Sequence, residues 1–109
     1  MDMKRGDLVS VVLAGAYGKP RPALVIQSDL FQKHPSITIL PITSQLRPIE
    51  TFRVAAEPTN KNGLRAPSQI MVDKAHTIPR DKAGDPFGEL EARTLTAVNR
   101  ALAVFLGLG

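Results

Sequence analysis

Arg21 lies between two prolines in the segment KPRPALVIQSD, directly before a run of strand-forming apolar residues. Proline fixes its own φ angle and pushes the residue before it toward an extended conformation, so the Arg21 backbone has little freedom. A guanidinium stays charged at any working pH and can hold a phosphate through two parallel hydrogen bonds. Arg21 is therefore a candidate for stabilising negative charge on a phosphoryl group. The alternative is a surface arginine that makes one weak ion pair.

Three polar residues, Thr43, Ser44 and Gln45, follow an apolar segment in LPITSQ. The Thr43 hydroxyl can donate a hydrogen bond to a phosphate oxygen or help to orient a reacting hydroxyl. Threonine is also a favoured strand residue, which leaves a purely structural role open. The side chains of Ser44 and Gln45 can add hydrogen bonds to the same ligand only if this strand end faces the same cleft as Arg21.

Asp73 ends the segment SQIMVD and is a candidate general base. An unperturbed aspartate has a pKa near ~3.9, so this role requires burial or a special partner. The alternative is a structural hydrogen-bond acceptor. His76 titrates in a more useful range, but a single histidine is more often structural or exposed, and His34 in its connecting segment is a weaker candidate.

Other catalytic classes find little support in the sequence. There is no cysteine, no H-x-x-H or H-E-x-x-H pattern and no EF-hand loop, so we expect no bound metal and no other cofactor. No Walker-type glycine loop is present, and nothing indicates a Ser-His-Asp arrangement. Chemistry on phosphate without a metal is the enzymatic reading that these residues favour.

Composition indicates a small soluble protein that prefers polyanions. The 109 residues are 43% hydrophobic, which predicts one domain over residues 1–109. The N-terminal segment lacks the apolar core of a signal peptide and no stretch is long enough to span a membrane, so we expect a cytoplasmic protein. Residues 1–80 carry 11 Lys and Arg against 6 Asp and Glu, whereas residues 81–109 carry 3 against 4. Such a basic body favours nucleic acid, although a basic surface without a target is the alternative.

Short strands and one terminal helix must position these residues. The helix is expected over residues 92–106, because Leu95, Val98, Leu102 and Phe105 fall on one helical face and Gly107 can end it. The expected strands cover residues 7–13, 23–27, 37–43, 52–55 and 69–73, with a short extension or bend at 76–79. The second is nearly all apolar and is expected to be buried on both faces, and Pro41 indicates a bulge or an edge in the third. This pattern predicts a mainly β fold, a small twisted antiparallel barrel with a helix packed on it.

Four blocks of the sequence resemble the MazF/PemK family of toxin–antitoxin ribonucleases. They are MKRGDLVSV, GKPRPALVIQSD, LPITSQ and PSQIMVDKAHTI, in the family's order, and the FGEL turn before a terminal helix also fits. The resemblance implies an SH3-like β-barrel with a C-terminal helix, built as a homodimer and neutralised by an antitoxin. It also implies cleavage of single-stranded RNA, such as mRNA, at short sequences without a metal. The 2′-hydroxyl of the substrate attacks the adjacent phosphate, leaving a 2′,3′-cyclic phosphate and a 5′-hydroxyl.

The family's catalytic arginine corresponds to Arg21 and its threonine partner to Thr43. Two departures limit what can be transferred. The first loop, AGAYGK, is shorter than in many relatives and has no acidic residue, which bears on cleavage specificity. Met71 stands where some relatives have a basic residue that shares acid–base work with the following acid, so Asp73 remains only a possible contributor.

Six residues within or beside the recognised blocks are candidates for RNA contacts. Each also has an ordinary surface explanation. A tyrosine can stack on a base, and the others can meet phosphates or base edges. The candidates are Tyr17, Lys19, Ser44, Gln45, Arg47 and Lys74.

Two other functions are weighed against RNA cleavage. The CcdB group has the same barrel but poisons DNA gyrase by binding, through a C-terminal tip that contains a tryptophan. This chain has no tryptophan and keeps the arginine and threonine blocks. A homologue that binds RNA or an antitoxin without cutting is the other alternative.

Overall fold

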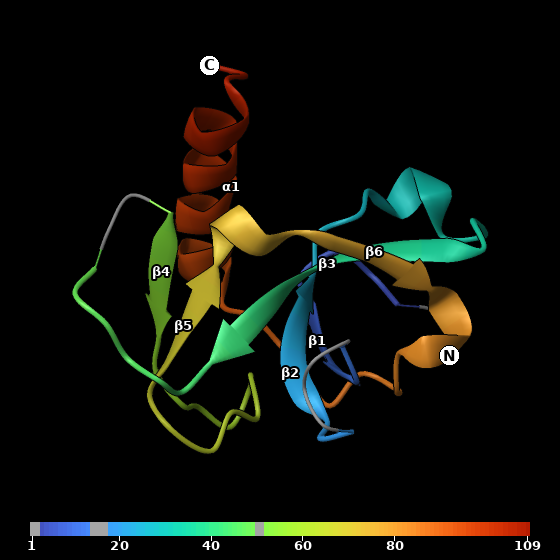
Figure 1. The fold of residues 1–109 in the computed structure, drawn as a ribbon, viewed down its shortest axis with the longest axis horizontal. Helices are drawn as coiled ribbons and strands as arrows, with labels where there is room; N and C mark the ends of the chain where they lie inside the picture. The colour runs from blue at the N-terminus through green and yellow to red at the C-terminus, as the bar shows by residue number, and fades with distance from the viewer. Residues whose placement is uncertain (1–2, 14–17, 50–51) are drawn as a thin grey trace.

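The computed structural model describes residues 3–13, 18–49 and 52–109 (Figure 1). Within these residues the chain forms seven strands and one α-helix: β1 Asp7–Val11, β2 Arg21–Val25, β3 Ser36–Thr43, β4 Arg53–Ala56, β5 Ser68–Met71, β6 His76–Pro79, β7 Gly88–Glu89 and α1 Ala92–Leu106. Short 3-10 turns lie between some of them: η1 Asp29–Phe31, η2 Val72–Lys74 and η3 Arg80–Lys82.

The strands form one antiparallel sheet in the order β4-β5-β3-β2-β1-β7. The long central strand β3 changes partner along one side, because residues 36–39 pair with β6 and residues 42–43 pair with β5. The sheet therefore curves into a half-barrel, and α1 packs beside β4 (Figure 1). This mainly β fold with a C-terminal helix is the one that the sequence predicted.

Both faces of the central strands β2 and β3 are buried, which the nearly all-apolar sequence predicted for the second strand. Leu24 and Leu40 pack with α1 residues in one core cluster. Val25 and Ile39, one position away on the same strands, belong to a second cluster on the other face. Alternate residues of a strand point to opposite faces, so neighbouring residues enter different cores.

The helix begins and ends where its periodicity predicts. Gly107 follows it with φ of 73°, a left-handed conformation that glycine adopts without strain. Val98 and Leu102 are buried, but Phe105 on the same face is 50% exposed. The reason is visible in Figure 1, where the last turns of α1 extend beyond the sheet.

Several predicted strand boundaries are wrong by two residues. The first strand ends at Val11, and the second begins at Arg21 and ends at Val25, so Arg21 lies on the strand itself. The fifth ends at Met71, which places Asp73 on η2 instead of at a strand end. Residues 76–79 form a true strand, and the expected turn at FGEL contains the two-residue strand β7.

Of the two expectations for Pro41, a bulge or an edge, the edge is wrong, since β3 is central. Pro41 pairs with Ala23 of β2 on one side. On the other side, the register with β6 ends at Ile39 and that with β5 begins at Ile42. Pro41 therefore lies where that ladder is interrupted, and this position tolerates a residue without an N–H.

The segment 57–64 joins the two outer edges of the sheet. Glu89 on β7 donates its backbone N–H to the Lys61 carbonyl at 3.0 Å. The approach is so close that a Cβ on Gly88 would lie 2.1 Å from the Asn62 carbonyl oxygen, which explains the glycine. Among the described residues, no helix has the length and apolar character needed to cross a membrane.

Candidate active site

A cleft of about 1090 Å³ contains both predicted catalytic residues. Arg21 lines it from the start of β2 and Thr43 from the end of β3, with Ser44 and Gln45 beside them. None of the described residues that line the cleft is acidic. The cleft is therefore suited to a negatively charged ligand.

The strand register explains why Arg21 and Thr43 meet. The pairs Ala23–Pro41 and Leu24–Leu40 define the antiparallel alignment of β2 and β3. The ladder ends at Ala23–Pro41, and Arg21 and Thr43 each lie two residues beyond this last pair, at the start of β2 and the end of β3. Positions two apart on a strand share a face, so both side chains lie on the face that carries Val25, away from the helix-facing cluster.

The Thr43 hydroxyl has a fixed orientation. Its Oγ1 accepts a hydrogen bond from the Gln45 backbone N–H at 3.0 Å. Because a hydroxyl has one donor and two acceptor sites, its proton stays available for a ligand in the cleft. Thr43 is partly exposed and Arg21 is exposed, so both can reach a bound molecule.

Two cleft residues were missed by sequence reasoning, Arg65 and Phe87. Arg65 is exposed in the segment GLRAPS, which lines the cleft just before β5. Like Lys19 and Arg21, Arg65 is a basic residue that stands shortly before a proline near the start of a strand. This similarity could have identified it from the sequence. Phe87 precedes β7 and is 43% exposed. No local pattern marks it, because it reaches the cleft only through the pairing of β7 with β1.

A buried amide holds the segment that carries Arg65. Asn62 is 0% exposed. Its Oδ1 accepts the backbone N–H groups of Thr59 and Leu64, and its Nδ2 donates to the Glu57 carbonyl and the Glu91 carboxylate. Such a fully satisfied amide fixes the loop conformation next to the cleft.

Glu91 completes this network at the start of α1. The Thr59 hydroxyl donates to its Oε2 at 2.6 Å, and Asn62 donates to its Oε1 at 3.0 Å. The hydrogen bond from Thr59 is the main reason why the pKa of Glu91 is lowered from 4.5. Partial burial opposes this shift, and the bond from Asn62 reinforces it.

Other predicted RNA-contacting residues lie outside the cleft or outside the described residues. Lys19, Arg47 and Lys74 are exposed, but none of them lines the cleft. They remain able to contact a strand that runs beyond it. Tyr17 lies outside the described residues.

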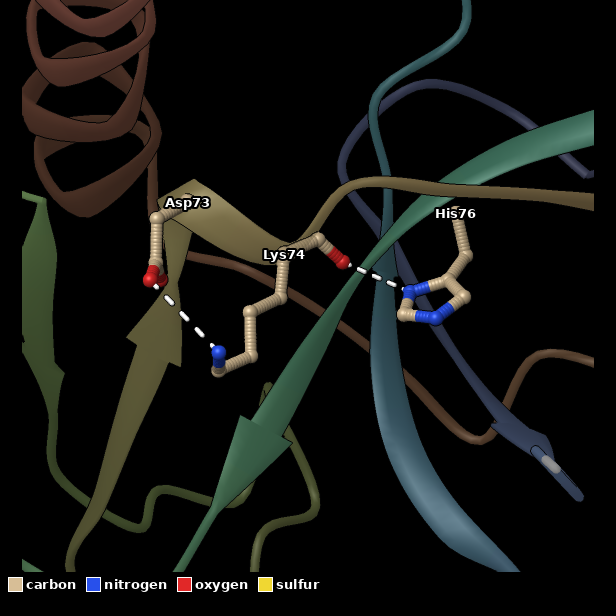
Figure 2. A network of polar contacts seen from close by, with 3 residues as sticks. All are labelled: Asp73, Lys74 and His76. Atoms are coloured by element: carbon tan, nitrogen blue, oxygen red, sulfur yellow. Dashed lines mark hydrogen bonds and ion pairs between the residues drawn. The ribbon is translucent and has the colours of Figure 1, made fainter. Parts of the chain in front are cut away.

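Asp73 also lies outside the cleft, on the turn between β5 and β6 (Figure 2). Its Oδ2 is 3.7 Å from Lys74 Nζ, and its Oδ1 is buried with no partner among the described residues. His76 Nδ1 lies 2.7 Å from the Lys74 carbonyl oxygen, which requires that Nδ1 carry the proton.

His34 has a local structural contact. Its Nδ1 accepts the Ser36 backbone N–H at 3.1 Å, which caps the turn before β3. Neither histidine lines the cleft. Over residues 3–13, 18–49 and 52–109, no group of three or more His, Cys, Asp or Glu residues could hold a metal ion.

Comparison with known proteins identifies relatives along almost the whole chain. Residues 4–106 match the model of the family described as "PemK-like, MazF-like toxin of type II toxin-antitoxin system". A "Probable endoribonuclease MazF" of Mycolicibacterium smegmatis is 40% identical over 107 residues, covering 97% of this chain and 98% of the relative.

Solved structures agree with this match. A mycobacterial endoribonuclease in complex with its cognate antitoxin superimposes with a TM-score of 0.82 at 25% identity, covering 98% of this chain and 97% of that one. The Mycobacterium tuberculosis toxin MazF-mt6 gives a TM-score of 0.80 at 26% identity, covering 94% and 98%.

Proposed function

This chain belongs to the PemK/MazF family of type II toxins, and we propose that it is a sequence-specific endoribonuclease that cleaves single-stranded RNA without a metal. The observation that carries the proposal is the meeting of Arg21 and Thr43 in one cleft without acidic lining residues. An RNA strand would bring a phosphate to this pair, as expected for a site built around a fixed guanidinium.

The reaction needs little more than positioning and charge stabilisation. The 2′-oxygen of the substrate forms a bond to phosphorus while the bond to the 5′-oxygen breaks. The 2′-hydroxyl loses its proton and the leaving oxygen gains one, giving a 2′,3′-cyclic phosphate and a 5′-hydroxyl. Arg21 stabilises the extra negative charge of the five-coordinate phosphorus. The Thr43 hydroxyl donates to a phosphate oxygen and holds the phosphate in line.

The rest of the cleft would bind neighbouring nucleotides. Arg65 is suited to a second phosphate, and the exposed ring of Phe87 to stacking on a base. Ser44 and Gln45 offer polar groups to base edges. Asp73 is given no step here, because it does not line the cleft.

The decisive experiment incubates the purified protein with a long single-stranded RNA in EDTA and maps the new ends. We expect cuts at a repeated short sequence with 5′-hydroxyl ends. Removing the charge stabilisation or the donor should lower the cleavage rate by about 100-fold or more in R21A or T43A. R100A removes a matched exposed charge from α1 and should cut like the wild type.

Other outcomes of that experiment identify the alternatives. Unchanged cleavage by R21A would contradict the catalytic assignment, and loss of cleavage in EDTA would contradict the metal-free mechanism. Intact RNA together with toxicity in cells would favour a binding toxin of the gyrase-poison kind. RNA that is bound and left uncut would favour a non-cleaving homologue.

We further propose a homodimer that acts in the cytoplasm as a single-domain toxin and is neutralised by a cognate antitoxin. A net charge of +4 favours an acidic, partly disordered antitoxin segment that covers the cleft. Four apolar side chains at the end of α1 and just after it support self-association because they are 50–75% exposed: Val104, Phe105, Leu106 and Leu108.

A further inference from the structure

We propose that Gln69 is a positioning residue for the cleft, because its buried amide holds residues 45–47 and, through them, the Thr43 hydroxyl. This inference rests on the proposed ribonuclease function for its catalytic consequence. Gln69 lies on β5 and is 4% exposed. It pairs directly with Thr43 across the β3–β5 ladder.

The amide of Gln69 binds one peptide position from both sides. Its Oε1 accepts the Arg47 backbone N–H at 3.2 Å, and its Nε2 donates to the Arg47 carbonyl at 2.7 Å. In a sheet, a neighbouring strand bonds both the N–H and the carbonyl group of a residue in this way. Here the Gln69 side chain makes both bonds to a segment that is not a strand. The segment after β3 is thereby tied to the sheet.

Arg53 fixes the orientation of that amide. Its Nη1 donates to Gln69 Oε1 at 2.8 Å, and Arg53 is itself 8% exposed. The oxygen of Gln69 thus faces two donors and its nitrogen faces an acceptor, so a flipped amide would lose all three bonds. A longer contact of 3.5 Å joins the same Nη1 to the Gln45 carbonyl.

The chain of contacts ends at the proposed catalytic hydroxyl. Gln45 donates its backbone N–H to Thr43 Oγ1 at 3.0 Å, and Gln45 lies between Thr43 and the clamped Arg47. Moving residues 45–47 would therefore turn the Thr43 hydroxyl and displace Gln45, which lines the cleft. A displacement of about 1 Å at a reacting group can cost on the order of 100-fold in rate.

The test compares Q69L with a matched control, Q27L. Gln27 makes the same kind of clamp, since its amide bonds the Phe31 and Ser36 carbonyls and the Thr38 N–H, but it follows the far end of β2 and does not line the cleft. We expect kcat for RNA cleavage to fall about 10- to 100-fold in Q69L and to stay at the wild-type value in Q27L. Both are measured well below their melting temperatures.

A double-mutant cycle separates positioning from general destabilisation. If Gln69 acts through Thr43, then adding Q69L to T43A should cause little further loss of kcat. Q69E serves as a second variant in case Q69L folds poorly, because its carboxylate still accepts from Arg47 and Arg53 but cannot donate to the Arg47 carbonyl. Hydrogen exchange at the Arg47 amide should be faster in Q69L than in the wild type, whereas Q69E, which keeps the acceptor for this amide, should exchange closer to the wild-type rate.

An unchanged kcat in Q69L would overturn the inference. It would also be overturned if Q69L lowered kcat by the same factor in T43A as in the wild type. Unchanged exchange at Arg47 in Q69L would overturn it as well. RNA left intact by the wild type would refute the proposed function instead, and the exchange measurement would still decide whether Gln69 holds the segment.

Discussion

At the scale of single residues, Arg21 and Arg65 bring two guanidinium groups to the cleft from different halves of the chain. Arg21 is held between prolines at the start of β2, and Arg65 lies in the segment before β5. In the proposed complex each neutralises a different phosphate. Each contact should therefore release counterions from the RNA and make binding sensitive to salt.

Replacing Arg65 by alanine should weaken RNA binding and its salt dependence without preventing cleavage at saturating RNA. Loss of one phosphate contact lowers the slope of log K against log salt by about 0.7 for a single strand. The measurement uses RNA with a 2′-deoxy nucleotide at the cut site, so that binding is seen without cleavage. R100A is the control with the same loss of charge, and an equal slope for R65A and wild type would count against the contact.

The sequence predicted the residues with strong local signals and missed those that arrive through tertiary pairing. Arg21 and Thr43 stand in short polar or proline-bounded motifs at strand ends, and strand pairing then places them together. Phe87 and Gln69 have ordinary local surroundings. Phe87 reaches the cleft because β7 pairs with β1, and Gln69 lies beside Thr43 because β5 pairs with β3.

At the scale of elements, the segment 57–64 is fastened to the start of α1 by the Glu91 carboxylate. Thr59 and Asn62 both donate to it. These bonds favour the ionised form, so folding lowers the pKa of Glu91 below 4.5. The resulting stabilisation is fully present above the unfolded-state pKa and is lost as the pH falls through the lower folded-state value.

Replacing Glu91 by glutamine should reduce the acid sensitivity of the fold. The free energy of unfolding, measured with urea at pH 7 and at about pH 3, should differ less between the two conditions in E91Q than in the wild type. E89Q is the control, because the exposed Glu89 carboxylate has no hydrogen-bond partner among the described residues. If the free energy of unfolding of E91Q changed between the two pH values as much as that of the wild type, this carboxylate would not couple the fold to pH.

Strand existence was more predictable than strand limits. The helix limits were right because the apolar periodicity runs through the whole segment and Gly107, in a left-handed conformation, ends it. The limits of β2 and β5 differ from the expected ones because Arg21 and Pro22 pair with β1 despite the flanking prolines, and the buried Val72 belongs to η2. The two-residue strand β7 has no periodicity to detect and exists only because it pairs with β1.

At the scale of the whole molecule, the exposed apolar end of α1 bears on the proposed homodimer. Phe105 lies in the last turns of the helix, which extend beyond the sheet, and is 50% exposed (Figure 1). Exposed clusters of apolar side chains, such as the one around Phe105, are uncommon on the surface of monomers and mark contact sites.

Sedimentation should give about twice the chain mass of 11.8 kDa for the wild type. F105K should raise the dimer dissociation constant at least tenfold, which corresponds to about 1.4 kcal/mol. Lysine suits the end of a helix, so the fold should persist. F31K is the matched control, since Phe31 on η1 is 55% exposed. A monomeric wild type, or an unaffected F105K dimer, would contradict the proposed interface.

The strand order also has a consequence for synthesis of the protein. Every cleft-lining residue in the described segments precedes Gly88, but some of the contacts that hold the segment before β5 come from β7 and Glu91. At about 5–20 residues per second, a ribosome needs about 1–4 s to make residues 88–106. For that interval a nascent chain has all of these lining residues but lacks the β7 and Glu91 contacts of the Arg65 segment, so the proposed RNA-binding cleft is completed only once these last residues are made.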